Sequence, residues 1–142
     1  MLRKDYIMRQ FEEFGIVIGA ILGLKRNKEW EKFELEIDKA VKLFTSLELT
    51  ELKELQLSEF EKLIHASSQL KPDQIKALAD LLYEQSFAEQ EKNNTKQAVD
   101  LLEKSLLLYT IYKNELTSNQ FNLETHYRIE LITKILNLPN PQ

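Results

Sequence analysis

The chain contains no cysteine and only three glycines and three prolines among its 142 residues. Without cysteine it has no disulfide bond, thiol nucleophile or thiolate metal site. Because sheets need many turns, and turns depend on glycine and proline, the scarcity of both favours long helices. All three glycines lie within residues 15–23, so the sequence also lacks a glycine-rich phosphate loop.

The chain has no excess of positive charge, with 19 basic and 23 acidic residues and a net charge of −4. Nucleic-acid binding depends on basic surfaces, so we expect no nucleic-acid partner. The apolar and charged fractions, 43% and 30%, are those of a globular protein. We expect a single helical domain over residues 1–138 and a frayed C-terminal tail over residues 139–142, where two of the prolines lie.

The sequence also lacks an apolar run long enough to cross a membrane. The uncharged run at residues 14–24 is about half of the roughly 20 residues that a spanning helix needs. A basic start precedes this run, as in a signal peptide, but Glu12 and Glu13 interrupt the segment and no small-residue cleavage site follows. We therefore expect no transmembrane segment and a cytoplasmic location.

Apolar residues recur at helical spacing along most of the chain, which predicts an all-α protein of six to seven antiparallel helices. The predicted helices cover residues 4–25, a segment after Asn27, a short turn from Thr50, and residues 58–66, 72–92, 95–116 and 122–136. Asn27 is a candidate N-cap, Ser58 with Glu61 and Asn94 with Gln97 resemble capping boxes, and Pro72 suits a first helical position.

The apolar faces of these helices identify the candidate core. Residues 15–24 are apolar on every side of the first helix, which predicts that this half is buried all round. The later helices carry apolar stripes on one side. In the helix over residues 95–116 the stripe comprises Ala98, Leu102, Ser105, Tyr109, Tyr112 and Leu116, and in the last helix the residues expected inward are Tyr127, Leu131, Ile132 and Ile135.

Two segments share a spacing that is typical of tetratricopeptide repeats. In residues 30–40 and 95–105 the same four positions hold two small or aromatic residues, then a large apolar residue, then a small one, and the segments start 65 residues apart (95 minus 30). That is close to two repeat units of about 34 residues. Tetratricopeptide-like helical hairpins are therefore predicted, with an irregular helical bundle as the alternative. A middle unit within residues 47–71 does not align.

Several short segments resemble a family of small uncharacterised bacterial proteins with a DYIMR-like N-terminal helix. The similarity rests on residues 4–9 (KDYIMR), 13–15, 21–25 and 81–85, followed by Ala98-x3-Leu102. It covers most of the chain and departs from the family at residues 47–71. The resemblance implies a first helix that leads into a tetratricopeptide-like array. It implies no chemistry, since the family has no assigned activity.

The sequence offers no convincing catalytic, cofactor-binding or metal-binding residues. His65 and His126 fall in different helices without a second ligand at metal-binding spacing, and Glu61 is more typical of a surface pair with His65. Aromatic residues offer one candidate binding region. The tyrosines that would line a groove for a peptide or small ligand, or else belong to the core, are Tyr83, Tyr109, Tyr112 and Tyr127.

Gly15, Gly19 and Gly23 form a ladder on one face of the first helix. Each glycine destabilises a helix by about 1 kcal/mol relative to alanine, so we expect close packing of another helix to offset the cost. That helix belongs either to the same chain, such as the one that holds residues 106–112, or to a second copy in a homodimer. The ladder is therefore a candidate helix-packing or dimer interface.

These observations favour a non-catalytic module that binds an unknown protein or peptide, as stacked helical hairpins usually do. A small-ligand-binding protein or enzyme with an enclosed pocket is the alternative. Association with a membrane surface through the first helix is a third. No cofactor is implied by any of the motifs.

Overall fold

The computed structural model describes residues 3–66, 70–115 and 122–137. Within these ranges the chain forms seven α-helices and no strand, which confirms the all-α prediction. The helices are α1 (Arg3–Arg26), α2 (Trp30–Thr45), α3 (Leu49–Glu54), α4 (Leu57–Ala66), α5 (Pro72–Glu91), α6 (Thr95–Glu115) and α7 (Leu123–Ile135).

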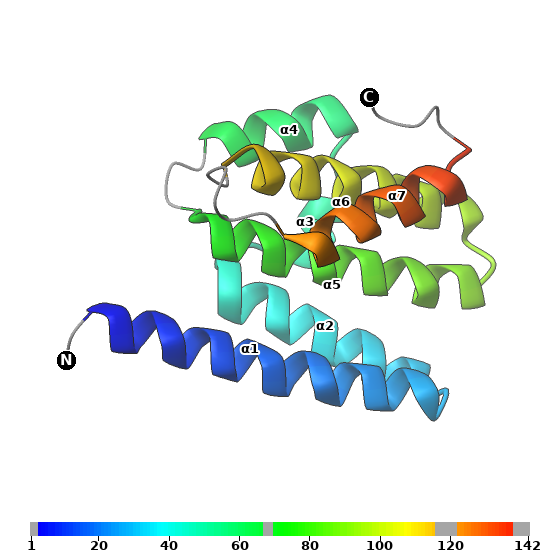
Figure 1. Ribbon diagram of the computed structural model, residues 1–142. Helices are drawn as coiled ribbons and strands as arrows, with labels where there is room; N and C mark the ends of the chain where they lie inside the picture. The colour runs from blue at the N-terminus through cyan, green and yellow to red at the C-terminus, as the bar shows by residue number, and fades with distance from the viewer. Residues whose placement is uncertain (1–2, 67–69, 116–121, 138–142) are drawn as a thin grey trace.

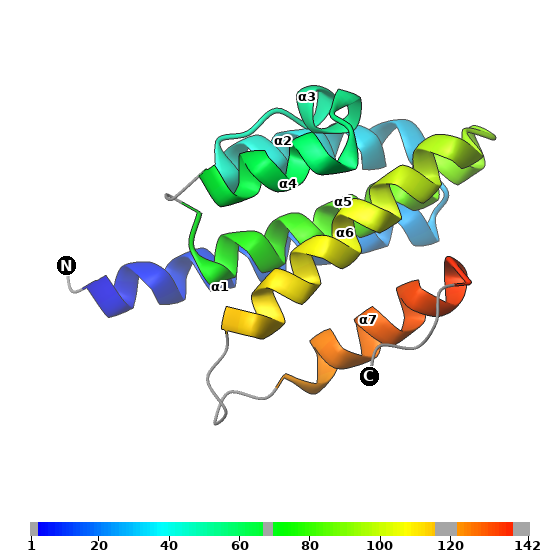
Figure 2. The same ribbon diagram turned by 90° about the horizontal axis from the view of Figure 1, so that it is seen from above.

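The long helices α1, α2, α5 and α6 lie side by side in that order across the molecule (Figure 1). The helix α1 packs against α2, α2 packs against α5, and α5 packs most extensively against α6. The last helix, α7, lies against α6 on the side away from α3 and α4, as Figure 2 shows. Consequently α5 and α6 form the centre of the fold, whereas α1 and α7 lie at its outside.

One cluster of buried apolar side chains draws on all seven helices. In α2, Phe33, Ile37 and Val41 are fully buried, as the helical spacing predicted. The stripe predicted in α6 is buried from Ala98 to Tyr112, whereas Leu116 lies outside the described residues. Because α3 and α4 contribute to the same cluster, the short middle helices close the core rather than form a separate unit.

Helix ends confirm some sequence signals. Pro72 is the first residue of α5, where its missing N–H is not needed. The Asn122 side chain accepts a 3.0 Å hydrogen bond from the Thr125 backbone N–H and caps α7. Ser46 and Asn93 adopt left-handed φ values of 64° and 62° after α2 and α5. These left-handed residues reverse the chain without glycine.

Two other predicted caps, at Asn27 and Ser58, are wrong. Asn27 belongs to the end of α1, because its backbone N–H donates to the Gly23 carbonyl, and Glu29 precedes the first residue of α2. Ser58 lies inside α4, which begins one residue earlier, so it is not an N-cap. The Asn94 side chain donates to the Glu89 carboxylate at 3.0 Å. Asn94 nevertheless directly precedes α6, and its backbone carbonyl accepts the first hydrogen bond of that helix, from Ala98 at 2.9 Å, as predicted for an N-cap.

The middle of the chain contains only short helices. The helix α3 has 6 residues and α4 has 10, compared with 20 in α5. The helix α4 packs against α6, and α3 packs against both α2 and α6. Residues 47–71 therefore do not form a hairpin of the same size as α5 and α6.

The prediction that the second half of α1 is buried all round is wrong. Ile21 is fully buried, but Ile16 is 74% exposed, and Gly15, Gly19 and Ala20 are exposed as well. Among the described residues, neighbours cover α1 on one side only. The opposite side is built from residues with little or no side chain, so its exposure leaves little apolar area in water apart from Ile16.

Candidate functional site

The four predicted tyrosines lie on α5, α6 and α7, of which α6 packs against both of the others. Tyr83 lies in α5, Tyr109 and Tyr112 in α6, and Tyr127 in α7. The first three are buried, whereas Tyr127 is exposed. The alternative that these residues belong to the core therefore holds for three of the four. Only Tyr127 presents its ring to a partner in solution.

The hydroxyl of Tyr109 is enclosed by charged groups. It donates a short hydrogen bond to the carboxylate of Asp80 and accepts one from the Arg128 guanidinium at 3.3 Å. Burial, together with the negative charge of Asp80, raises the pKa of the Tyr109 phenol well above its ordinary value. Tyr109 therefore remains protonated and acts as a hydrogen-bond donor, and it is unsuited to be a catalytic base.

Salt bridges connect this tyrosine to α7. The ammonium of Lys76 lies 3.0 Å from Asp80 and 3.6 Å from Glu124. Burial alone would lower the pKa of Lys76, but the two carboxylates outweigh it and raise the pKa above its ordinary value. The guanidinium of Arg128 stacks 4.0 Å from the centre of the Tyr83 ring. Two charged side chains of α7 thus hold it against α5 and α6.

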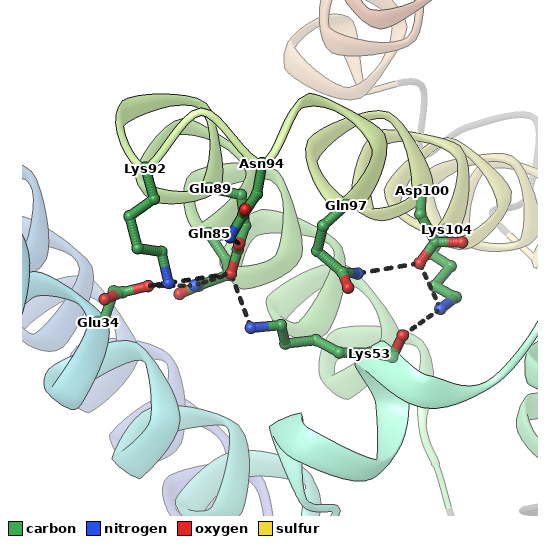
Figure 3. A network of polar contacts seen from close by, with 9 residues as sticks. All are labelled: Glu34, Lys53, Gln85, Glu89, Lys92, Asn94, Gln97, Asp100 and Lys104. Atoms are coloured by element: carbon green, nitrogen blue, oxygen red, sulfur yellow. Dashed lines mark hydrogen bonds and ion pairs between the residues drawn. The ribbon is translucent and has the colours of Figure 1, made fainter.

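A second polar network surrounds the carboxylate of Glu89, near the end of α5 (Figure 3). This carboxylate is 1% exposed and accepts hydrogen bonds from Lys53 at 2.7 Å, Asn94 at 3.0 Å and Gln85 at 3.1 Å. Burial would raise the pKa of Glu89, but these donors and the positive charge of Lys53 lower it to about 2. Glu89 is therefore a charged anchor for α3 and for the turn after α5.

The network extends outward in two directions, which Figure 3 displays together. On one side Lys92 pairs with Glu34 of α2 at 2.6 Å. On the other side the fully buried ammonium of Lys104 donates to the Leu52 carbonyl at 2.8 Å and lies 2.6 Å from Asp100. The network joins α2, α3, α5 and α6, and helical periodicity alone did not reveal it.

Both networks pair their charges internally, which is the arrangement of a structural clamp. Over the described ranges, no group of three or more histidine, aspartate or glutamate side chains is placed to hold a metal ion. Glu61 and His65 lie 3.8 Å apart with both side chains largely exposed, as expected for a surface pair. His126 is 3.1 Å from Glu130 on α7. The two histidines are thus engaged separately on different helices.

The glycine ladder faces solvent. A Cβ atom added to Gly15 or Gly19 would meet no described atom within 4 Å, and one added to Gly23 would meet the Arg26 guanidinium at 3.7 Å. The interpretation that another helix of the same chain packs closely against the ladder therefore fails, because the chain places α2 and α5 on the opposite side of α1. The second-copy interpretation stays a prediction.

Apolar side chains on the outer face of α7 form a surface that the sequence analysis missed. Leu123, Tyr127, Leu131 and Ile135 are each four residues apart, and we call them the α7 stripe. Leu123 is 70%, Tyr127 63% and Ile135 48% exposed, whereas Leu131 is half-buried. The prediction that Tyr127 and Ile135 point inward is thus wrong. Ile132 is fully buried and Leu131 packs against the core, as predicted, while Thr125, Ile129 and Thr133 complete the buried face. The spacing of four was the signal that could have revealed this stripe.

Comparison with known proteins returned no match among family models, curated proteins or solved structures. The resemblance to the bacterial family therefore stays a prediction. In the parts of the chain that the structure describes, each helix is too short or too polar to cross a membrane. The candidate sites are consequently judged on their geometry alone.

Proposed function

We propose that the protein is a non-catalytic interaction module that binds an amphipathic helix of another protein along the α7 stripe. The observation that carries this proposal is the exposure of Leu123, Tyr127 and Ile135 on one helix face. Large apolar side chains grouped on a surface are typical of binding sites, whereas single ones are common everywhere. Tyrosine is also enriched among the residues that dominate binding energy.

The length of the stripe suits a helical partner. From Leu123 to Ile135 the stripe rises about 18 Å along the axis at 1.5 Å per residue. Helices that dock on apolar surfaces use anchors three or four residues apart over a similar length. The stripe therefore offers contacts to about three turns of a partner helix.

The rest of the protein holds α7 ready for such a partner. Its inner face is anchored by Ile129 and Ile132 in the core and by Arg128 on the Tyr83 ring. A surface that is already ordered loses less conformational entropy when it binds. The hydrogen bonds of Tyr109 and the charge pairing around Asp80 serve this positioning and require no substrate.

We further propose that the long helices are arranged as tetratricopeptide-like hairpins, α1 with α2 and α5 with α6. What supports this is the shared spacing of the second helices and the close approach of α5 and α6, where the Ser105 hydroxyl donates to the Ala79 carbonyl at 2.9 Å. Arrays of this kind commonly bind peptides or proteins. The short α3 and α4 are where such an array would be interrupted.

Site-specific photo-crosslinking tests the proposed binding surface. The photoreactive amino acid benzoylphenylalanine replaces Tyr127, and a control places it at Lys32, which is 72% exposed on α2. In cells that naturally produce the protein, we expect a discrete adduct from position 127 and none from position 32. Adding Leu123→Ser and Ile135→Ser should abolish the adduct and leave the melting temperature nearly unchanged, because both side chains already face water.

Two results would overturn the proposal. One is an equal pattern of adducts from positions 127 and 32. The other is an adduct from position 127 that survives the two serine substitutions, because binding would then not depend on the stripe.

A further inference from the structure

The outer face of α1 is a second unpartnered surface, separate from the α7 stripe. The residues along its centre are spaced three or four apart and so lie on one side of the helix. We call them the glycine face: Glu12, Ile16, Gly19, Gly23 and Arg26. All except the half-buried Gly23 are exposed, and the buried Ile21 lies on the opposite side.

We propose that the glycine face binds the same face of a second copy of this chain, with the two α1 helices antiparallel. The first argument is shape. A Cβ atom on Gly19 would meet no described atom within 4 Å, and the large side chain of Ile16 beside it is 74% exposed. Two such faces bring helix backbones close together, and the two isoleucines then cover the glycines from both sides.

The second argument is charge complementarity. The acidic Glu12 stands at one end of the face, and the basic Arg26 stands at the other. Both are exposed. Parallel helices would place acid against acid and base against base, whereas antiparallel helices place acid against base. Only the antiparallel arrangement therefore gains from this distribution of charge.

The spacing of these residues along α1 allows the shape and the charges to match in one arrangement. If the two helices cross at Gly19, then Gly15 of one copy lies opposite Gly23 of the other, and Glu12 lies opposite Arg26. The twofold axis generates this ion pair twice. The contact spans about 21 Å, the rise of the 14 residues between Glu12 and Arg26 at 1.5 Å each. A twofold axis at Gly19 thus pairs every glycine with a glycine and Glu12 with Arg26.

Sedimentation equilibrium of the full chain tests the proposal over protein concentrations from about 1 μM to about 1 mM. We expect a monomer–dimer equilibrium in this range, and we expect Gly19→Leu to weaken the dimer by more than about tenfold, because a leucine at the crossing point separates the backbones. The matched control is Glu31→Leu, which adds the same side chain to an exposed position of α2. It should leave the dimer unchanged.

Charge reversal tests the antiparallel orientation. Glu12→Lys and Arg26→Glu should each weaken the dimer by about tenfold, and the double variant should recover most of the loss, because the reversed charges again face each other. The matched control, Glu31→Lys on α2, should have little effect. The double variant distinguishes this contact from a general effect of net charge, because its net charge equals that of the wild type.

Several outcomes would overturn the proposal. A wild-type chain that stays monomeric over the whole range is one, and a dimer that resists Gly19→Leu is another. Single reversals without recovery in the double variant would exclude the antiparallel pairing. A monomer that sediments with phosphatidylglycerol vesicles, and loses this binding on Arg26→Glu, would assign the face to a lipid surface instead.

Discussion

The helices α5 and α1 have opposite relations between composition and burial. In the long apolar stretch of α1, Ile16 and two of the glycines are exposed to water. In α5, by contrast, the charged side chains of Asp80 and Glu89 are buried. The difference follows from position. Neighbours pack on α5 from α2 and α6, while α1 has helices on one side only. Burial is therefore decided by what surrounds a helix. Polar side chains of a surrounded helix are buried too, where hydrogen-bond or charge partners are available to them.

The contact between these two helices shows the same rule on a smaller scale. The ammonium of Lys25 at the end of α1 lies 2.9 Å from the buried Glu84 carboxylate of α5 and 3.6 Å from the centre of the Phe87 ring. An ion pair and a cation–π contact thus hold the C-terminal end of α1 against α5. The glycine face, on the other side of the same helix, has no such counterpart within the described chain.

The largest expected effect in α5 comes from Asp80→Ala. Removal of this carboxylate leaves the Lys76 ammonium and the Tyr109 hydroxyl without their buried acceptor. We expect the free energy of unfolding to fall by about 3–5 kcal/mol. Urea denaturation measures the change. The control Asp38→Ala, at an exposed position of α2, should alter stability by less than about 0.5 kcal/mol. Similar losses in both variants would contradict the clamp assigned to Asp80.

The next effect depends on pH and tests Glu89. Its pKa is lowered to about 2 in the folded state, below the ordinary value of 4.5. A carboxyl group whose pKa is lowered by folding stabilises the protein above its unfolded pKa, and this contribution disappears as the pH falls through the folded pKa. We expect a loss of roughly 3 kcal/mol between about pH 5 and pH 2 that is attributable to this residue.

The measurement compares urea denaturation of the wild type and Glu89→Gln across that pH window. The wild type should be the more stable protein at pH 7, and the difference should shrink as the pH falls toward 2, because Glu89 becomes protonated as the pH approaches its folded pKa. A difference that is constant from pH 7 to pH 2 would contradict the ionised state of Glu89 in the folded protein.

The smallest expected effect lies in α1 and has the opposite sign. Because a Cβ on Gly19 meets no described atom, Gly19→Ala should stabilise the dilute monomer by about 0.5–1 kcal/mol through helix propensity. The inverse substitution at the fully buried Ala79 of α5, Ala79→Gly, should destabilise by at least about 1 kcal/mol. Thermal unfolding at low protein concentration measures both. Destabilisation by Gly19→Ala would indicate that another part of the chain packs on the glycine face.

Local signals predicted the helices well and their environments less well. Pro72 marked the start of α5 because it acts within its own first turn, whereas the capping role of Asn122 was not recognised. The cap at Asn27 was misplaced because Asn27 continues the end of α1, and the cap at Ser58 because α4 begins one residue earlier. In α7, Ile132 was correctly expected in the core, but Tyr127 and Ile135 were wrongly expected there, because apolar residues occur on two faces and only the packing of α6 selects between them.

For the candidate site, too, the sequence predicted the helices that carry the residues but not the contacts between them. Helical spacing suggested that Tyr83, Tyr109, Tyr112 and Tyr127 belong together, and all four do lie in the adjoining helices α5, α6 and α7. Their partners were not predictable. Arg128 reaches Tyr109 across 19 residues of sequence, and Lys53 reaches Glu89 across 36. Such contacts depend on how whole helices are placed.

By itself the sequence determined that the protein is helical, where most helices begin and end, and that one face of α1 is made of glycines. Those properties follow from interactions between residues three or four apart, which a sequence displays directly. Tertiary structure alone decided that the glycines face water, that Asp80 and Glu89 are buried, and that the outer side of α7 is apolar. These outcomes depend on contacts between distant helices, because burial is a property of the assembled fold.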